Sequence, residues 1–250
     1  MNAKGQIILN YTDEFKIACK INNLHFEELL QYFIDHVSFY AFIGGNMESV
    51  YLWATTVSID CKDFQGGQIE TITDQRIQQI SLKYIRKLTS LNLEPDLPES
   101  LETNKSVTIM REWAAEMLPL TDYLSEIKTQ TGELLQLTFD FNMLCRMNGI
   151  EVQHLLQYFI STISLARERA VNLLTIVKAD PSTAVLLFLV GSHEEVKDKI
   201  LPQQDVYKQY GLKLLRLDRK LKEVKDLETR IKIYSSFYRE WYNALQSDIN

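Results

Sequence analysis

The chain carries an internal repeat at a fixed offset of 126 residues. Residues 19–38 read CKINNLHFEELLQYFIDHVS and residues 145–164 read CRMNGIEVQHLLQYFISTIS, so nine of these twenty positions are identical. At an offset of 128, Arg111-Glu112-Trp113 matches Arg239-Glu240-Trp241. Because the offset of 126 residues is close to half of 250, the pattern predicts a helical unit duplicated in tandem, with residues 1–123 as the first copy and 124–250 as the second.

The composition favours an all-α fold with about five helices in each unit. Hydrophobic residues make up 46% of the chain and charged residues 24%, which is typical of a globular protein with a real core. Nine Gly and five Pro are few, as expected for long helices with short connections. Alternation of apolar and polar residues, the signature of a strand, is confined to Gln6–Tyr11.

Helical periodicity and helix-breaking residues place the elements of the first unit. The expected helices cover residues 12–21, 25–43, 47–64, 73–91 and 106–123. Asn22-Asn23 ends the first, because Asn tolerates the left-handed conformation at a helix end. The segment LEPDLPESLETN before the last helix, with two Pro and four acids, is expected to be a loop.

The second unit follows the same order. Its first helix is expected over residues 124–147, and Asn148-Gly149 ends it. Asp180-Pro181-Ser182 is a typical helix start, with Pro in the first turn. From Tyr210 to Leu245 apolar residues recur with four-three spacing, apart from one extra step of three between Val224 and Leu227. This slip predicts either one long C-terminal helix or two helices that bend there.

The sequence favours a soluble protein in the cytoplasm. Residues 1–15 contain no sizeable apolar core and no cleavage site, so no signal peptide is expected. The longest apolar stretch, residues 184–190, is far shorter than the roughly 20 residues that a membrane span needs. Three Cys without close spacing fit a reducing compartment.

Charge is unevenly distributed along the chain. The net charge is −6, but residues 208–232 hold nine basic and four acidic residues. The nine form the predicted basic strip: Lys208, Lys213, Arg216, Arg219, Lys220, Lys222, Lys225, Arg230 and Lys232. Interleaved acids favour a solvated face with pairs such as Lys222–Asp226, while binding to nucleic acid or to an acidic partner stays an alternative.

Four residues mark a second candidate, an interaction face on the second helix of each unit. Gln31 matches Gln157 and Ser38 matches Ser164, although these positions fall on the polar side of the helix. They indicate either a contact surface shared by both units or remnants of an incompletely diverged duplication.

The turn between the first two helices has the shape of a helix-turn-helix, but its chemistry favours a packed helical hairpin. A recognition helix carries Arg, Lys, Asn or Gln where it meets bases and phosphates. Here Glu27 and Glu28 occupy the start of the helix and would repel phosphates. We therefore expect no DNA reading by this element.

Catalytic and metal-binding patterns are weak. The chain contains no G-x-S-x-G, P-loop or G-x-G-x-x-G motif. Cys19 and Cys145 are expected to be small packing residues. The pairs His25/Glu28 and Glu151/His154 lie beside the apolar stripe of the second helix, which does not favour a metal site. No catalytic residue and no cofactor is therefore predicted.

The motif Cys-x-x-Asn-x-Leu-x4-Leu-Leu-Gln-Tyr-Phe-Ile, with the following residues 39–46, resembles a group of short, uncharacterised bacterial helical proteins. The resemblance covers residues 12–46 and, more loosely, 138–164. It implies a bacterial cytosolic protein with a link to mobile genetic elements, and it carries over no catalytic residue.

These observations predict a non-enzymatic helical interaction or scaffold protein with an unknown protein partner and no membrane association. The alternative is a nucleic-acid-associated regulator that uses the basic strip. The two differ in the expected response to salt, because phosphate contacts make binding fall steeply with ionic strength. An enzyme whose site is assembled from scattered residues is the third possibility.

Overall fold

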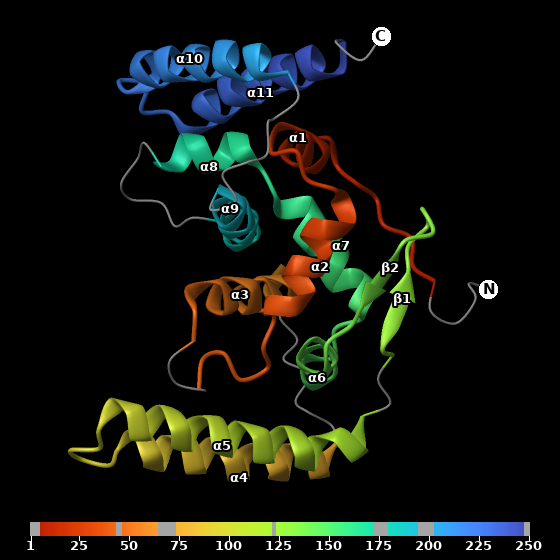
Figure 1. The fold of residues 1–250 in the computed structure, drawn as a ribbon, viewed down its shortest axis with the longest axis vertical. Helices are drawn as coiled ribbons and strands as arrows, with labels where there is room; N and C mark the ends of the chain where they lie inside the picture. The colour runs from red at the N-terminus through yellow and green to blue at the C-terminus, as the bar shows by residue number, and fades with distance from the viewer. Residues whose placement is uncertain are drawn as a thin grey trace. The chain divides into compact units, whose positions relative to one another are not determined.

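The computed structural model describes residues 6–43, 47–64, 74–121, 124–172, 180–194 and 203–247. In these residues the chain forms eleven α-helices and one two-stranded sheet, which confirms the all-α class (Figure 1). The elements are α1 (Asp13–Ile21), α2 (Phe26–His36), α3 (Ser49–Phe64), α4 (Gln75–Asn92), α5 (Glu99–Met117), β1 (Glu126–Lys128), β2 (Leu134–Gln136), α6 (Phe139–Asn148), α7 (Val152–Thr162), α8 (Leu165–Asn172), α9 (Pro181–Glu194), α10 (Gln204–Leu221) and α11 (Leu227–Ser247).

The compact units differ from the predicted halves 1–123 and 124–250. One unit takes residues 1–9 and 31–158, and the other takes 10–30 and 159–250. The physical reason is packing. Helix α1 lies against α11, far along the chain, while α6 packs against α3. The unit boundary therefore falls inside α2 and inside α7.

Helices α1 and α6 begin and end in the same way. Thr12 caps α1, because its side chain accepts a hydrogen bond from the Phe15 amide. Thr138 caps α6 in the same way, by accepting a hydrogen bond from the Phe141 amide. After α1, Asn23 adopts a φ of 52°, and after α6 Gly149 adopts a φ of 64°. The predicted helix stops at Asn22-Asn23 and Asn148-Gly149 are thus confirmed, because both turns need a left-handed residue.

The two capping threonines also make reciprocal contacts. The Thr12 hydroxyl donates to the Ile160 carbonyl over 3.4 Å, and the Thr138 hydroxyl donates to the Ile34 carbonyl over 3.4 Å. Both pairs of positions are related by 126 residues. Reciprocity of this kind, in which i meets j and j meets i, is the contact pattern of a twofold interface.

Two helical hairpins, α4–α5 and α10–α11, carry the same aromatic pair. Tyr84 stacks on Trp113 with ring centroids 6.0 Å apart, and Tyr210 stacks on Trp241 at 5.7 Å. Beside each pair a Lys side chain lies over the Tyr ring and binds a Glu of the facing helix. In α4–α5 these residues are Lys87 and Glu112, and in α10–α11 they are Lys213 and Glu240. The counterparts are 126 or 128 residues apart, the offsets of the sequence repeat.

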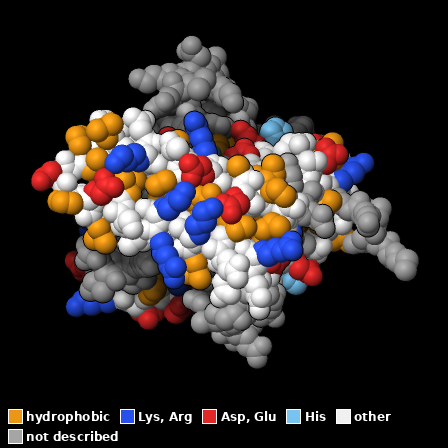
Figure 2. Space-filling model, turned by 90° about the horizontal axis from the view of Figure 1, so that it is seen from below, with side chains coloured by type: hydrophobic (Ala, Val, Ile, Leu, Met, Phe, Trp, Pro, Cys, Tyr) orange, Lys and Arg blue, Asp and Glu red, His pale blue; other side chains and the backbone are white. Residues whose placement is uncertain are grey.

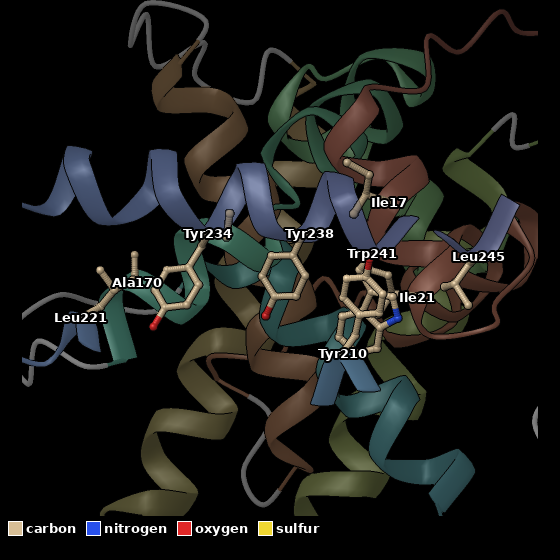
Figure 3. Close-up of a cluster of buried hydrophobic side chains, with 10 residues drawn as sticks. Ile17, Ile21, Ala170, Tyr210, Leu221, Tyr234, Tyr238, Trp241 and Leu245 are labelled. Atoms are coloured by element: carbon tan, nitrogen blue, oxygen red, sulfur yellow. The ribbon is translucent and has the colours of Figure 1, made fainter. Parts of the chain in front are cut away.

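The second hairpin belongs to a buried cluster in which α11 supplies a row of large side chains. Tyr234, Tyr238, Trp241 and Leu245 project from one side of α11 toward α1 and α8 (Figure 3). Their spacing of four, three and four places them on one helical stripe. This row is the second part of the predicted C-terminal seam, and its burial explains the seam's periodicity.

The seam itself spans two helices. The chain leaves the helix after Leu221 and starts α11 at Leu227, where the Asp226 carboxylate accepts a hydrogen bond from the Thr229 amide. The slip at Val224–Leu227 therefore marks a break between two helices, the second of the two predicted alternatives. Helix α11 has 21 residues.

The expected helix over residues 124–147 is wrong. Its first part forms the antiparallel hairpin β1–β2, and only residues from Phe139 onward are helical, in α6. Gly132, at a φ of 91°, provides the turn, a conformation that other residues rarely adopt. The predicted alternation at the N-terminus is confirmed beside this hairpin, since Ile7 and Leu9 are buried while Ile8 is half exposed, and Gln6 bridges Lys128.

Two other predicted boundaries move. Helix α2 ends at His36 instead of continuing to residue 43, because Ser38 turns its amide toward the Thr55 hydroxyl. Helix α5 begins at Glu99 instead of residue 106, so part of the predicted acidic loop is helical. Acidic residues in the first turn, Glu99 and Glu102, suit the positive end of the helix dipole.

Candidate interaction site

The predicted interaction face on the second helices is taken up by contacts within the chain. The Gln31 side chain pairs with the backbone of β2: its amide donates to the Gln136 carbonyl over 2.9 Å, and the Gln136 amide donates to it over 2.8 Å. Ser38 lies beyond α2 and is fully buried. An exposed contact face therefore cannot include Ser38.

Ser164 occupies the same kind of joint at the start of α8. Its amide donates to the Thr183 hydroxyl over 3.1 Å, as the Ser38 amide does to Thr55 over 3.1 Å. Its hydroxyl donates to the Glu14 carboxylate over 3.1 Å and accepts from the Arg167 amide. Gln157, the fourth member, is partly buried on α7. Internal contacts thus account for the identity of the two serines.

The carboxylates at these joints are also equivalent. Asp140 lies 126 residues after Glu14 and accepts hydrogen bonds from Ser38 and Tyr40, as Glu14 accepts from Ser164. Burial raises the pKa of Asp140 to about 6, against the lowering effect of its two hydrogen bonds. The serine–carboxylate joint is therefore reciprocal, in the same sense as the threonine caps.

The predicted basic strip divides into residues with different surroundings. Arg230 is fully buried, which removes it from any binding surface. Lys213 binds Glu240 over 3.0 Å and covers the Tyr210 ring. Lys225 and Lys232 are exposed in the inter-helix turn and on α11. The remaining five cations all lie exposed at the end of α10 or along it: Lys208, Arg216, Arg219, Lys220 and Lys222.

Two leucines lie among these five cations. Leu212 is 59% exposed and Leu215 is 55% exposed. Within the described part of the chain, none of the five cations forms an ion pair. We define the α10 face as these seven residues: Lys208, Leu212, Leu215, Arg216, Arg219, Lys220 and Lys222.

Asp218, the one acidic residue between residues 208 and 222, does not neutralise the α10 face, because it points inward. Its carboxylate accepts hydrogen bonds from Arg169 over 3.2 Å and from the Tyr234 hydroxyl over 2.8 Å. Burial would raise the pKa of Asp218, but these bonds and the nearby arginine charges hold it below its ordinary value. The expected pair Lys222–Asp226 is not formed, since Asp226 caps α11.

The corresponding surface of the α4–α5 hairpin has a different character. A groove of about 650 Å³ runs between the two helices, with Leu91, Leu101 and Ile109 in its lining. Three of its lysines bind carboxylates: Lys83 to Glu116, Lys87 to Glu112 and Lys105 to Glu94. Figure 2, which views the α4–α5 side, shows blue and red side chains next to one another. This surface is therefore close to charge balance along its length.

The turn of that hairpin is acidic and apolar. Leu93 is 76% exposed and Leu101 is 50% exposed, and the segment between them carries no basic residue. Its acids are Glu94, Asp96, Glu99 and Glu102. At the left end of Figure 2, where this turn lies, red and orange side chains gather. We call residues 93–102 the acidic tip.

The three cysteines lie in surroundings that do not favour a reactive thiol. Cys19, Cys61 and Cys145 are buried, and burial raises the pKa of the Cys61 thiol to about 11 and that of Cys145 to about 12, which disfavours the reactive thiolate. In the described residues, no three His, Cys, Asp or Glu side chains gather as a metal site. No helix in that part of the chain has the length and apolarity to cross a membrane.

Sequence reasoning located the cations of the α10 face but missed its leucines. Four-three spacing assigned Tyr210, Leu214 and Leu217 to the buried seam, and Leu212 and Leu215 fall off that stripe. The sequence signal for their exposure was that both leucines lie on the side of the helix away from the buried seam. Comparisons of the chain with family models, with curated proteins and with solved structures found no match.

Proposed function

We propose that the protein is a non-enzymatic helical adaptor whose α10 face binds an acidic, amphipathic segment of a partner protein. The observation that carries this proposal is the pair of exposed leucines within a row of cations that form no ion pair with the described residues. Leucines without cations would fit many apolar partners, and cations without leucines would fit any polyanion. The combination selects a partner that offers apolar side chains flanked by carboxylates.

The geometry of α10 fits a helix-to-helix contact. Lys208, Leu212, Leu215, Arg219 and Lys222 follow one another with steps of four, three, four and three. This is the spacing of a helical seam, here on the exposed side of α10. The stretch from residue 208 to 222 is about 22 Å long at 1.5 Å per residue. A partner helix of similar length would cover both leucines and reach all five cations.

Nucleic acid is the second candidate for the same face. Five cations without ion pairs would attract phosphates, and this observation favours it. The exposed leucines weigh against it, because phosphate contacts need no apolar side chains. The chain as a whole is acidic, with a net charge of −6, which disfavours broad attraction of a polyanion outside this face.

Binding of two probes to matched variants tests the proposal. The probes are a helical peptide with a leucine stripe flanked by glutamates, and a short DNA duplex, each followed by fluorescence anisotropy. We expect Leu212→Ser with Leu215→Ser to abolish peptide binding, and Leu134→Ser, a 53% exposed leucine on β2, to leave it unchanged. Tight DNA binding that survives the leucine changes and falls steeply with salt would replace the proposal by the nucleic-acid alternative.

We further propose that the chain arose by tandem duplication and that its two halves reproduce the contacts of a homodimer. The reciprocal threonine caps, the serine–carboxylate joints and the two Tyr–Trp pairs support this, since each recurs at an offset of 126 or 128 residues. For the location we propose the cytoplasm. The three cysteines are buried free thiols, which suits a reducing compartment.

A further inference from the structure

The acidic tip has the composition that the α10 face is proposed to bind. It carries four acids and two exposed leucines, Leu93 and Leu101, in ten residues. The α10 face carries five cations and two exposed leucines, Leu212 and Leu215. Each surface thus offers apolar side chains flanked by charges, and the charges of the two surfaces are opposite in sign.

From this complementarity we propose that the α10 face of one copy binds the acidic tip of a second copy of the chain, so that the protein associates head to tail. The inference rests on the proposed function and names its partner. Leu212 and Leu215 of one copy would pack on Leu93 and Leu101 of the next. Arg216 and Arg219 would lie near Asp96 and Glu102, since Glu94 already binds Lys105.

The groove beside the acidic tip provides room for the incoming leucines. Leu101 and Glu94 line it at the tip, together with Leu91 from the end of α4. Its lysines at this end and further along are held by Glu94, Glu112 and Glu116, which lowers their repulsion of the incoming cations. Arg86 also lines the groove, and among the described residues it forms no ion pair. Because Arg86 would repel the incoming cations, we expect the second copy to bind at the end of the groove next to the acidic tip and away from Arg86.

An interface between two different surfaces has a distinctive consequence. After two copies pair, one α10 face and one acidic tip remain unused on the pair as a whole, so association continues into rings or open chains. An interface that uses the same surface twice stops at a dimer. A face about 22 Å long buries little area, and interfaces of that size are weak and reversible. Association is therefore expected to rise with protein concentration and to fall with salt.

Two variants of the full-length protein separate the surfaces. The face variant is Leu212→Ser with Leu215→Ser, and the tip variant is Leu93→Ser with Leu101→Ser. All four leucines are at least half exposed, so both variants are expected to fold like the wild type, which circular dichroism checks. Leu134→Ser is the matched control.

Sedimentation velocity over a range of concentrations gives the test. We expect the wild type and Leu134→Ser to form species larger than a dimer, and each double variant alone to stay monomeric. Mixed in equal amounts, the two variants should form a dimer and nothing larger, because one intact α10 face then meets one intact acidic tip. A monomeric wild type at every concentration, or a mixture that stays monomeric, would overturn the inference.

The outcomes also separate the inference from the proposed function. If the wild type binds the acidic peptide through Leu212 and Leu215 yet remains a monomer, self-association is wrong and the adaptor function stands. If it associates but the tip variant associates equally well, the acidic tip is not the partner surface. If it neither associates nor binds the peptide, both proposals fail.

Discussion

Replacement of Arg230 by Met should stabilise the folded protein. The Arg230 side chain has no exposed surface, and its Nε, Nη1 and Nη2 atoms have no hydrogen-bond partner in the described chain. A guanidinium in this position has lost its hydration, and its attraction to the nearby Asp218 offsets part of that cost. Asp218 does not depend on Arg230, because Arg169 and Tyr234 already donate to it.

The magnitude follows from removal of this buried charge. Buried ion groups replaced by apolar side chains of similar volume give changes from zero to about 4 kcal/mol in favour of the folded state. We expect about 2 kcal/mol for Arg230→Met, which corresponds to a rise in Tm of about 4–8 °C for a chain of this size. Urea unfolding followed by circular dichroism measures the free energy, and calorimetry measures Tm.

The matched control is Arg219→Met, an exposed arginine on α10, which should change the free energy of unfolding by less than about 0.5 kcal/mol. Peptide binding should show the reverse order: weakened by Arg219→Met and unaffected by Arg230→Met. A loss of about 3 kcal/mol or more for Arg230→Met would contradict this prediction, because it would mean that the guanidinium forms a strong pair in the folded state.

Three further predictions concern stability. Asp140→Asn should stabilise the protein at neutral pH by up to about 3 kcal/mol. Because the pKa of Asp140 is raised from 3.8 to about 6, the folded wild type binds more protons than the unfolded chain, and its stability falls as pH rises from about 4 to 6. Urea unfolding at a series of pH values should show that this slope is flattened in the variant. Thr12→Ala and Thr138→Ala should each cost about 1 kcal/mol in thermal or urea unfolding, and a clear inequality between them would contradict the equivalence of the two caps. Gly132→Ala should destabilise the β1–β2 hairpin by about 1 kcal/mol or more, because φ is 91° there; unchanged hydrogen exchange of the hairpin amides would argue against this.

The helical class and most helix ends were predictable because they depend on local rules. The Asn22-Asn23 and Asn148-Gly149 stops follow from left-handed backbone conformations, and the start of α9 follows from Asp180-Pro181. The sheet was not predictable from alternation, since β1 and β2 have three residues each. Such short strands leave too few positions for a period of two to be recognised.

The environments of individual side chains depend on distant packing, which the sequence pattern does not reveal. Arg230 belongs to a basic run in the sequence, yet the fold buries its side chain completely. Ser38 and Ser164 have the same role within the chain. The Ser38 amide donates a hydrogen bond to Thr55 of α3, and the Ser164 amide donates one to Thr183 of α9. Identity across a repeat pointed to the right residues but not to their internal role.

The most direct test of the adaptor proposal is the affinity of the α10 face for the acidic amphipathic peptide, measured by anisotropy titration on the wild type and on Leu212→Ser with Leu215→Ser. We expect saturable binding of the peptide to the wild type, a moderate decrease in affinity with salt, and loss of binding in the variant with an unchanged circular dichroism spectrum. Equal affinity of the two proteins for the peptide would contradict it, because the exposed leucines would then have no part in recognition.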